Sequence, residues 1–293
     1  MPDGSQGSLS EQDIFHRRLA RFNEHRFMPG LPHDDWEAEI EDHAQLLLEE
    51  GRWIERFRAS VADRAAEAPR TPDGFIAWFE ELEHSGPGQN DPLFPWLAEE
   101  ASMEEMRWFL TQEVAGEAGF EDLTAITQVR LPTQPKLELA RNYWDEMGRG
   151  NPKGMHGPML QKVAQSLRLT PSVETTVWES LAMANTMAAL ACNRRYAFHS
   201  VGALGVIEQT APSRAKLVGE GLKRLGVDAG DRHYFDLHAI LDIKHSEAWN
   251  AEAGMPLVAW RPELAPTLAE GALMRLECGA ACFRRYRQAL GRP

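Results

Sequence analysis

Cysteine is scarce in this chain of 293 residues, which contains Cys192, Cys278 and Cys282 and no others. An odd set of three cysteines does not indicate a disulfide framework. Cys278 and Cys282 lie one helical turn apart beside small residues at 279–281, a pattern that favours close helix packing. Because no second Cys or His pair lies nearby, the sequence does not predict a structural zinc site.

Positive charge is also in short supply, since 31 Lys and Arg face 44 Asp and Glu, for a net charge of −13. A nucleic-acid-binding protein normally presents a net basic face, so we expect no nucleic-acid partner. The start of the chain does not combine basic residues with an apolar run, so no secretory signal is predicted. The longest weakly apolar stretch, residues 181–192, is interrupted by Asn185 and too short to cross a bilayer. We therefore expect a cytoplasmic protein with no membrane partner.

Strand-like alternation, internal repeats and low-complexity segments are all absent from the sequence. Apolar residues instead recur at three- and four-residue spacing, which predicts amphipathic helices and an all-α fold. The expected helices cover 11–26, 34–67, a segment ending near 82, 97–123 with a break or bend near Gly116 and Gly119, 136–146, 158–167, 173–198, 202–208, 213–225, 232–249 and 262–290.

The composition is that of a folded protein, with 43% hydrophobic and 26% charged residues. We expect residues 1–10 to form a disordered tip and 11–293 to form one helical domain, in which the helices within 11–85 pack on the core. Small residues at 181–191 and 271–281 would allow close helix packing, either within the chain or across a homodimer.

The most informative segment of the chain is 232–249, which holds His238, Asp242 and His245. At about 100° of rotation per residue these three side chains share one face of a helix, which makes that face a candidate metal-binding surface. A metal-free alternative is a His/Asp hydrogen-bonded pair or a simple core histidine. The residues between them are apolar and predict a largely buried helix: Leu237, Ile240, Leu241 and Ile243.

Other helices offer carboxylates that could complete a metal site, as facing helices do in bundle proteins. Glu208 follows the apolar run 201–207, where a carboxylate is poorly solvated unless it binds something. The alternative is an ion pair between Glu208 and Arg214. Glu146 ends an aromatic-rich helix just before two glycines, and His156 follows ten residues later in a segment that permits tight turns.

A further carboxylate could come from the helix expected near 106–123. Glu113 and Glu117 lie one turn apart on the same face as apolar residues, so either could point inward, and Glu121 is a less favoured choice. Most glutamates on such a helix face solvent, and the sequence does not select one of the three.

The ordered set of six residues resembles the haem-oxygenase-like diiron oxidases and oxygenases, also described as iron-containing redox enzymes. That family's pattern is a Glu, a His about ten residues later, and another Glu about thirty residues before a final His-x3-Asp-x2-His. In this sequence the pattern falls on Glu146, His156, Glu208, His238, Asp242 and His245. The match extends over about 113–245.

The resemblance implies a seven-helix haem-oxygenase-like bundle, here with extra N-terminal helices, that binds two Fe2+ per chain and activates O2 as a co-substrate. Family members that hydroxylate an amine nitrogen carry one more carboxylate ligand on an earlier helix, which would be Glu117 or, second, Glu113. Members that cleave C–C bonds or decarboxylate amino or fatty acids generally lack it. We expect oxidation of a small amine- or amino-acid-like metabolite, with N-oxygenation ahead of C–C cleavage, and no haem.

The residue types fit this chemistry without the resemblance. Carboxylates and imidazoles without thiolates suit Fe(II) or Mn(II). No Gly-x-Gly-x-x-Gly fingerprint for a flavin or nicotinamide is present, so electrons must come from an external donor. Aromatic candidates for the wall of a substrate pocket are Trp108, Tyr143, Trp144 and Phe235.

Two alternatives keep the fold and dispense with iron. One is a metal-free helical protein that binds a small molecule in its cavity, and the other is a cofactorless oxidase or thiaminase-like hydrolase of the same superfamily. Six inward-facing residues of ligand type argue against both alternatives.

Overall fold

The computed structural model describes residues 9–116 and 119–292, and it is built from helices. The α-helices are α1 (Glu11–Phe27), α2 (Trp36–Ala65), α3 (Pro72–Ser85), α4 (Leu93–Glu99), α5 (Met103–Gly116), α6 (Phe120–Thr127), α7 (Thr133–Glu146), α8 (His156–Ser166), α9 (Trp178–Cys192), α10 (Ala197–Arg224), α11 (His233–Trp249), α12 (Met255–Trp260) and α13 (Leu264–Ala289). Across these two ranges, extended backbone pairs only in an isolated bridge between Met147 and Met155. The all-α prediction is confirmed.

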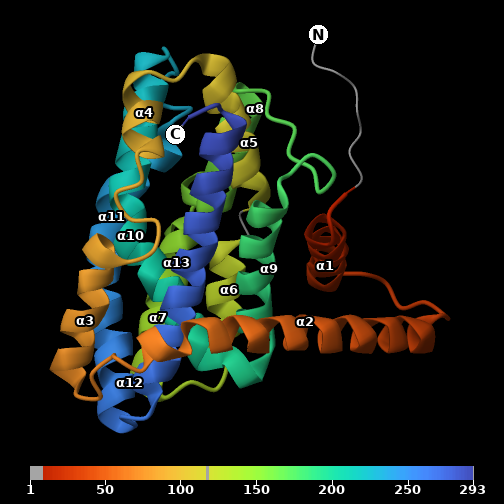
Figure 1. Cartoon of the computed structure of the whole chain (residues 1–293), viewed down its shortest axis with the longest axis vertical. Coiled ribbons are helices and arrows are strands. Elements are labelled where there is room, and N and C mark those ends of the chain that lie inside the picture. The colour runs from red at the N-terminus through yellow and green to blue at the C-terminus, as the bar shows by residue number, and fades with distance from the viewer. Residues whose placement is uncertain (1–8, 117–118, 293) are drawn as a thin grey trace.

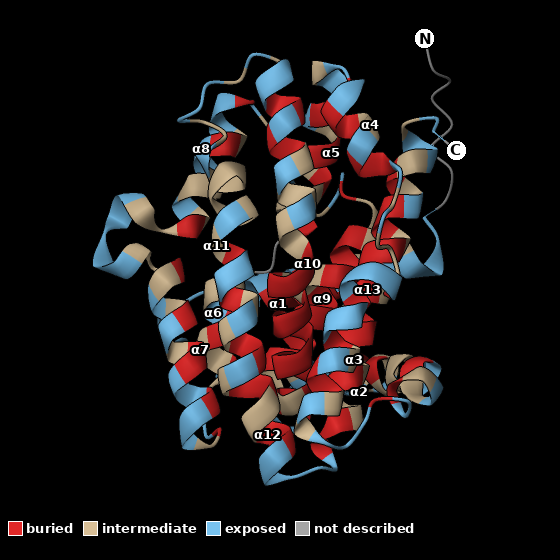
Figure 2. Cartoon of the chain, turned by 90° about the vertical axis from the view of Figure 1, so that its left-hand side faces the viewer, coloured by how far each residue is buried: buried red, intermediate tan, exposed pale blue. Residues whose placement is uncertain are grey.

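The centre of the bundle is formed by α9, α10 and α13, where buried residues gather (Figures 1 and 2). These helices are rich in Ala and Gly, and small side chains let helix axes approach closely. A Cβ on Gly202 would lie 1.9 Å from the carbonyl oxygen of Leu268, and a Cβ on Gly271 would lie 1.9 Å from that of His199. The backbones of α10 and α13 are therefore in direct contact at two points. Most residues of 181–191 and 271–281 are buried within the bundle, so their small side chains contribute to packing within the chain.

Replacing Gly271 with alanine should therefore force α10 and α13 apart. We expect the free energy of unfolding to fall by about 1–3 kcal/mol or more, as for other overpacked cores. A matched control is Gly51→Ala in α2, where a Cβ would meet nothing within 4 Å. That change should stabilise the helix by about 0.5–1 kcal/mol. Urea denaturation measures both, and equal effects at the two glycines would contradict the close contact.

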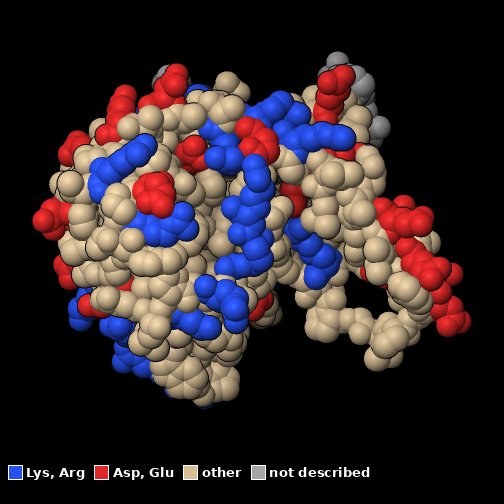
Figure 3. Space-filling view, turned by 90° about the horizontal axis from the view of Figure 1, so that it is seen from below, with Lys and Arg blue, Asp and Glu red and all other residues tan. Residues whose placement is uncertain are grey.

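The N-terminal helices lie on the outside of the bundle. Helix α1 packs on α9, where the side-chain amide of Asn23 donates to that of Asn185 at 2.7 Å. Helix α2 contacts α13 through its C-terminal half, and its N-terminal half projects away from the bundle (Figure 1). Exposed acidic residues such as Glu37 and Glu41 line this projecting half, as Figure 3 shows. No helix in the described part of the chain is long and apolar enough to span a membrane.

Several helix boundaries differ from the sequence-based expectations. Residues 173–198 do not form one helix, because α9 ends at Cys192 and the side chain of Asn193 accepts from the backbone N–H of Arg195 in the following turn. Helix α10 runs without interruption to Arg224 and contains Pro212, whereas two shorter helices were expected. Within 97–123 the expected break near Gly116 and Gly119 is confirmed, since α5 ends at Gly116 and Gly119 is left-handed at a φ of 71°, but a second break between α4 and α5 was not expected. Of the expected disordered tip, 1–8 lie outside the described residues, and Ser10 caps α1.

Candidate metal centre

Four helices bring the six predicted ligands together in the interior. Glu146 ends α7, His156 begins α8, Glu208 lies within α10, and α11 supplies the other three. The turn between α7 and α8 is tight because Gly148 and Gly150 adopt φ values of 61° and 82°, which residues with a Cβ rarely adopt. The bridge between Met147 and Met155 closes this turn. It places the side chains of Glu146 and His156 side by side.

Five of the six residues form two overlapping groups of potential ligands. Glu146, His156 and His238 make the first, and Glu146, Glu208 and His245 make the second, with ligand atoms within 4.8 Å of one another in each group. Glu146 belongs to both groups. A carboxylate has two oxygens, so one Glu can serve two metal ions at once, as in the carboxylate-bridged sites of helical bundles. Asp242, the sixth residue, is 3% exposed and lies one turn from both His238 and His245 on α11.

Contacts outside the six residues fix how the ligands point. Nδ1 of His238 lies 2.6 Å from the carbonyl oxygen of Tyr234. A carbonyl can only accept, so Nδ1 carries the proton and Nε2 is left as the metal-binding atom. The amide of Asn142 donates to Oε1 of Glu208 at 2.5 Å. Nε2 of His245 donates to Asp145 at 3.4 Å, which leaves its Nδ1 directed toward Glu208 at 3.4 Å.

Unpaired polar atoms show that these residues suit a cation. Nδ1 of His156 lies 2.5 Å from Oε2 of Glu146, yet it makes no hydrogen bond to any described residue. Oδ1 of Asp242 is likewise buried without a hydrogen-bond partner in the described part of the chain. Buried polar atoms normally find partners, and imidazole nitrogens and carboxylate oxygens gathered this closely are atoms that a metal ion can bind together. The donor set is nitrogen and oxygen only, as Fe(II) or Mn(II) prefers.

The pKa values record the same crowding of charge. Burial, followed by the charges of Glu208 and Glu146, raises the pKa of Asp242 well above its ordinary value. Burial and the charge of His245 lower the pKa of His156 to about 4, and burial and His156 lower that of His238 to about 4. Burial also lowers the pKa of His245, but Glu208, Glu146 and Asp145 together raise it to about 9. In the metal-free protein His245 is therefore the main positive charge beside the carboxylates.

Of the other carboxylates considered from sequence, Glu113 and Glu121 line a cavity beside the ligands but belong to neither ligand group. Glu117 lies outside the described residues. Glu113 accepts a hydrogen bond from Tyr286 at 2.8 Å and belongs to neither ligand group. Glu121 lies beside the start of α8, where its Oε1 would be 2.8 Å from a Cβ on Gly157. The predicted alternative pair of Glu208 with Arg214 does not form, because Arg214 donates to Thr210.

Two sequence-based interpretations of the surroundings are wrong. Helix α11 is not largely buried, since Ile240 is 68% and Ile243 49% exposed on the face opposite the ligands. Of the four aromatic residues proposed for the pocket, Phe235 lines it, whereas Trp144 is 53% exposed and Trp108 and Tyr143 are not among its described lining residues. The orienting residues Asn142 and Tyr234 were missed. Tyr234 lies four residues before His238 on the same helix, so helical spacing could have indicated it. Asn142 orients Glu208 on a different helix, so only the packing of α7 against α10 reveals its role.

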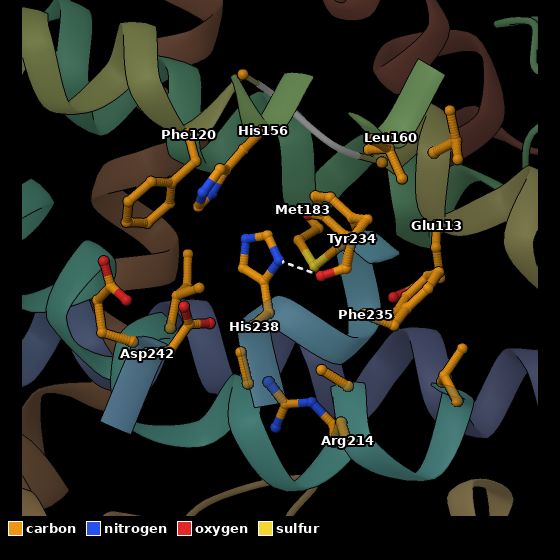
Figure 4. Close-up of a pocket in the computed structure, with 18 of the residues that line it drawn as sticks. Glu113, Phe120, His156, Leu160, Met183, Arg214, Tyr234, Phe235, His238 and Asp242 are labelled. Carbon is orange, nitrogen blue, oxygen red and sulfur yellow. Dashed lines mark hydrogen bonds between the residues drawn. The ribbon is translucent and has the colours of Figure 1, made fainter. Parts of the chain in front are cut away.

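A cavity of about 230 Å3 adjoins the ligands (Figure 4). Five of the six ligands contribute to its wall, and the rest is mainly apolar, including Phe109, Leu110, Phe120, Leu160, Met183 and Phe235. Small-molecule sites are typically apolar hollows with a few polar groups in fixed places. This cavity has room for a small metabolite next to the ligand side chains.

A second group of ligand-type residues lies on the surface between α1 and α2. It consists of His25, Glu39 and His43, of which His25 is exposed and the other two are half-buried. Solvated His and Glu side chains at a surface often lie close without an ion. The buried groups around Glu146 differ because water cannot satisfy their polar atoms.

The bundle and its interior together define a helical protein with a buried carboxylate–histidine centre beside a small-molecule cavity. The chain belongs to the family described as iron-containing redox enzymes, whose model matches residues 107–280. All six ligand-type residues fall inside this range. A search of curated proteins finds no match.

Among solved structures, the chain is similar to a CADD-like protein of unknown function from Nostoc punctiforme. The TM-score is 0.53 at 14% sequence identity, over 81% of this chain and 98% of the other. At this identity the similarity concerns the fold alone.

Proposed function

We propose that this protein is a nonhaem diiron oxygenase that oxidises a small amine- or amino-acid-like metabolite. It would hold two Fe2+ per chain, use O2 as co-substrate and receive electrons from an external donor. The observation that carries this proposal is the pair of buried ligand groups that share Glu146 beside a cavity. Membership in the iron-containing family favours iron as the metal, and the nitrogen and oxygen donor atoms suit that ion.

The residues present would divide the work as follows. His156 and His238 on one side, and Glu208 and His245 on the other, would hold two ions with Glu146 between them. Iron bound there would supply the redox chemistry that reduces O2. The protein's own part is to fix the ligands through Asn142, Asp145 and Tyr234, and to keep water away with the apolar wall of the cavity.

By the family resemblance, one additional carboxylate ligand would favour N-oxygenation over C–C cleavage. We propose N-oxygenation ahead of oxidative C–C cleavage or decarboxylation, with Glu117 as the additional ligand. Glu113 is the weaker choice because its carboxylate accepts from Tyr286. If neither Glu117→Gln nor Glu113→Gln lowers iron content or activity, neither residue is a ligand, and C–C cleavage becomes the favoured reaction.

A single-turnover experiment tests the proposed function. Protein loaded anaerobically with two equivalents of Fe(II) is mixed with 18O2 and a panel of amines and amino acids. We expect an oxidised product whose amount follows iron content, with 18O on nitrogen for N-oxygenation. The His245→Ala variant should give none, because the second ligand group loses its imidazole. If the chain binds a substrate but takes up no iron, the result would instead support the alternative function, that of a metal-free protein that binds a small molecule.

A further inference from the structure

A second set of charged residues lies in the wall of the same cavity, apart from the metal ligands. It consists of Arg214 on α10, Arg275 on α13 and Glu113 on α5. In Figure 4, Glu113 lies on the opposite side of the cavity from Asp242 and Phe120, and Arg214 rises from α10 into the cavity. Arg214 lies six residues after Glu208, which corresponds to a rise of about 9 Å along the helix. The cavity therefore has a metal-binding part and a separate cationic part.

The guanidinium group of Arg214 is held in place by its neighbours. It donates to the hydroxyl of Thr210 at 3.1 Å and to the side-chain carbonyl of Gln89 at 3.5 Å. Its Cζ lies 5.9 Å from the ring centre of Phe94 and 5.7 Å from that of Phe283, within the range of cation–π attraction. A guanidinium fixed between two rings keeps donors free for a ligand.

The cationic part carries more positive than negative charge. Glu113 is tied to Tyr286, whose hydroxyl also contacts Ser180 at 2.7 Å. Among the described residues, no carboxylate lies within ion-pair distance of either arginine, although the charge of Glu113 acts on both. Burial, followed by the charge of Arg275, lowers the pKa of Arg214 only to about 10, so it stays protonated near neutral pH. Two guanidinium groups against at most one carboxylate leave an excess of at least one positive charge.

An uncompensated charge beside an apolar cavity is costly unless a ligand of opposite sign neutralises it. We propose that Arg214 and Arg275 bind a carboxylate of the substrate, so that the substrate is a carboxylic acid of the amino-acid-like class and not a simple amine. This inference rests on the proposed function for the position of the reacting atom, which would lie at the ligand end of the cavity. An excess of one charge matches a monoanionic carboxylate better than a dianionic phosphate, and guanidinium groups pair with carboxylates through two parallel hydrogen bonds.

Binding of simple carboxylates to the full-length chain tests the inference. Straight-chain alkanoates from butanoate to decanoate are titrated by calorimetry, beside the alkanamides, alkylamines and alkyl phosphates of the same length. We expect alkanoates to bind best, with affinity rising about fourfold per methylene until the cavity is full. Arg214→Gln and Arg275→Gln should each weaken alkanoate binding by about tenfold or more, and leave alkanamide binding unchanged. Arg261→Gln, on the exposed surface, is the matched control.

The titrations are made with the metal-free chain and with the Mn(II)-loaded chain. Arg214→Lys keeps the positive charge and replaces the glutamine variant if that variant does not fold. Its affinity for alkanoates should still fall, because lysine cannot form the two parallel hydrogen bonds that arginine forms with a carboxylate. Alkanoates that bind no better than alkanamides, or binding that neither arginine substitution weakens, would overturn the inference. Tighter binding of alkyl phosphates would overturn the choice of carboxylate. Arginine-dependent binding in a chain that takes up no iron would refute the proposed function and leave this inference standing.

Discussion

Glu146→Ala is expected to remove both irons from the protein, whereas loss of any ligand found in only one group should remove one. Glu146 is the residue that the two groups share, and each group retains only two other ligands without it. Metal content should fall from about two equivalents per chain to well below one, with loss of all iron-dependent activity. His156→Ala, which affects the first group only, should retain about one equivalent. Anaerobic Fe(II) titration followed by desalting and metal analysis measures the difference.

The matched control is Glu138→Gln on the same helix. Glu138 is 2% exposed and pairs with Arg141, and it belongs to neither ligand group. The Glu138→Gln substitution should leave iron content unchanged, so it distinguishes the effect of losing a metal ligand from the effect of losing any buried carboxylate. Far-ultraviolet circular dichroism verifies that each variant keeps its helices. Equal iron content in Glu146→Ala and His156→Ala would contradict a shared carboxylate.

Metal binding should release protons, and the apparent affinity should therefore rise steeply with pH. In the metal-free protein the carboxylates raise the pKa of His245 to about 9, so its imidazole is protonated at pH 7. Burial and the charges of Glu208 and Glu146 raise the pKa of Asp242 well above its ordinary value, so Asp242 keeps its proton to a higher pH than an ordinary aspartate. A metal ion must displace these protons, and each one makes the affinity increase about tenfold per pH unit below the corresponding pKa.

The sign and size of this effect can be measured directly. His156 and His238, with pKa values of about 4, are already neutral at pH 6–8 and should release nothing there. We expect metal binding to release about one to two protons per chain. The part of the pH dependence of affinity that comes from His245 should disappear above about pH 9. Calorimetric titration with Mn(II) in buffers of different ionisation enthalpy gives the number. A binding enthalpy that is the same in every buffer would contradict protonated ligands in the metal-free protein.

How much of this site could be predicted from sequence depends on helical spacing. His238, Asp242 and His245 recur on one face of α11, and the turn glycines after Glu146 indicate a sharp return toward His156. Local patterns therefore indicate five of the six ligands. The same patterns predicted burial for Ile240 and Ile243, which are exposed, because apolar residues on a helix do not reveal which side faces its neighbours. Tertiary packing decides that question.

Other features depend on which helices meet, and a single sequence does not contain that information. Arg214 and Glu113 lie about 100 residues apart in the chain and share a cavity only because α5, α10 and α13 converge. Local propensity also misplaced the break in α10. Pro212 usually ends a helix, but here the buried stretch before it and the contacts with α11 and α13 hold the helix together.

The most direct test of the diiron assignment is an anaerobic Fe(II) titration of the wild-type chain, with His43→Ala as the control for the surface group of His25, Glu39 and His43. The shared Glu146 predicts about two irons per chain in both proteins, with Mössbauer and magnetic measurements showing that the two ions are coupled after exposure to O2. One iron per chain, two uncoupled irons, or loss of an iron in His43→Ala would contradict a two-metal centre built around Glu146.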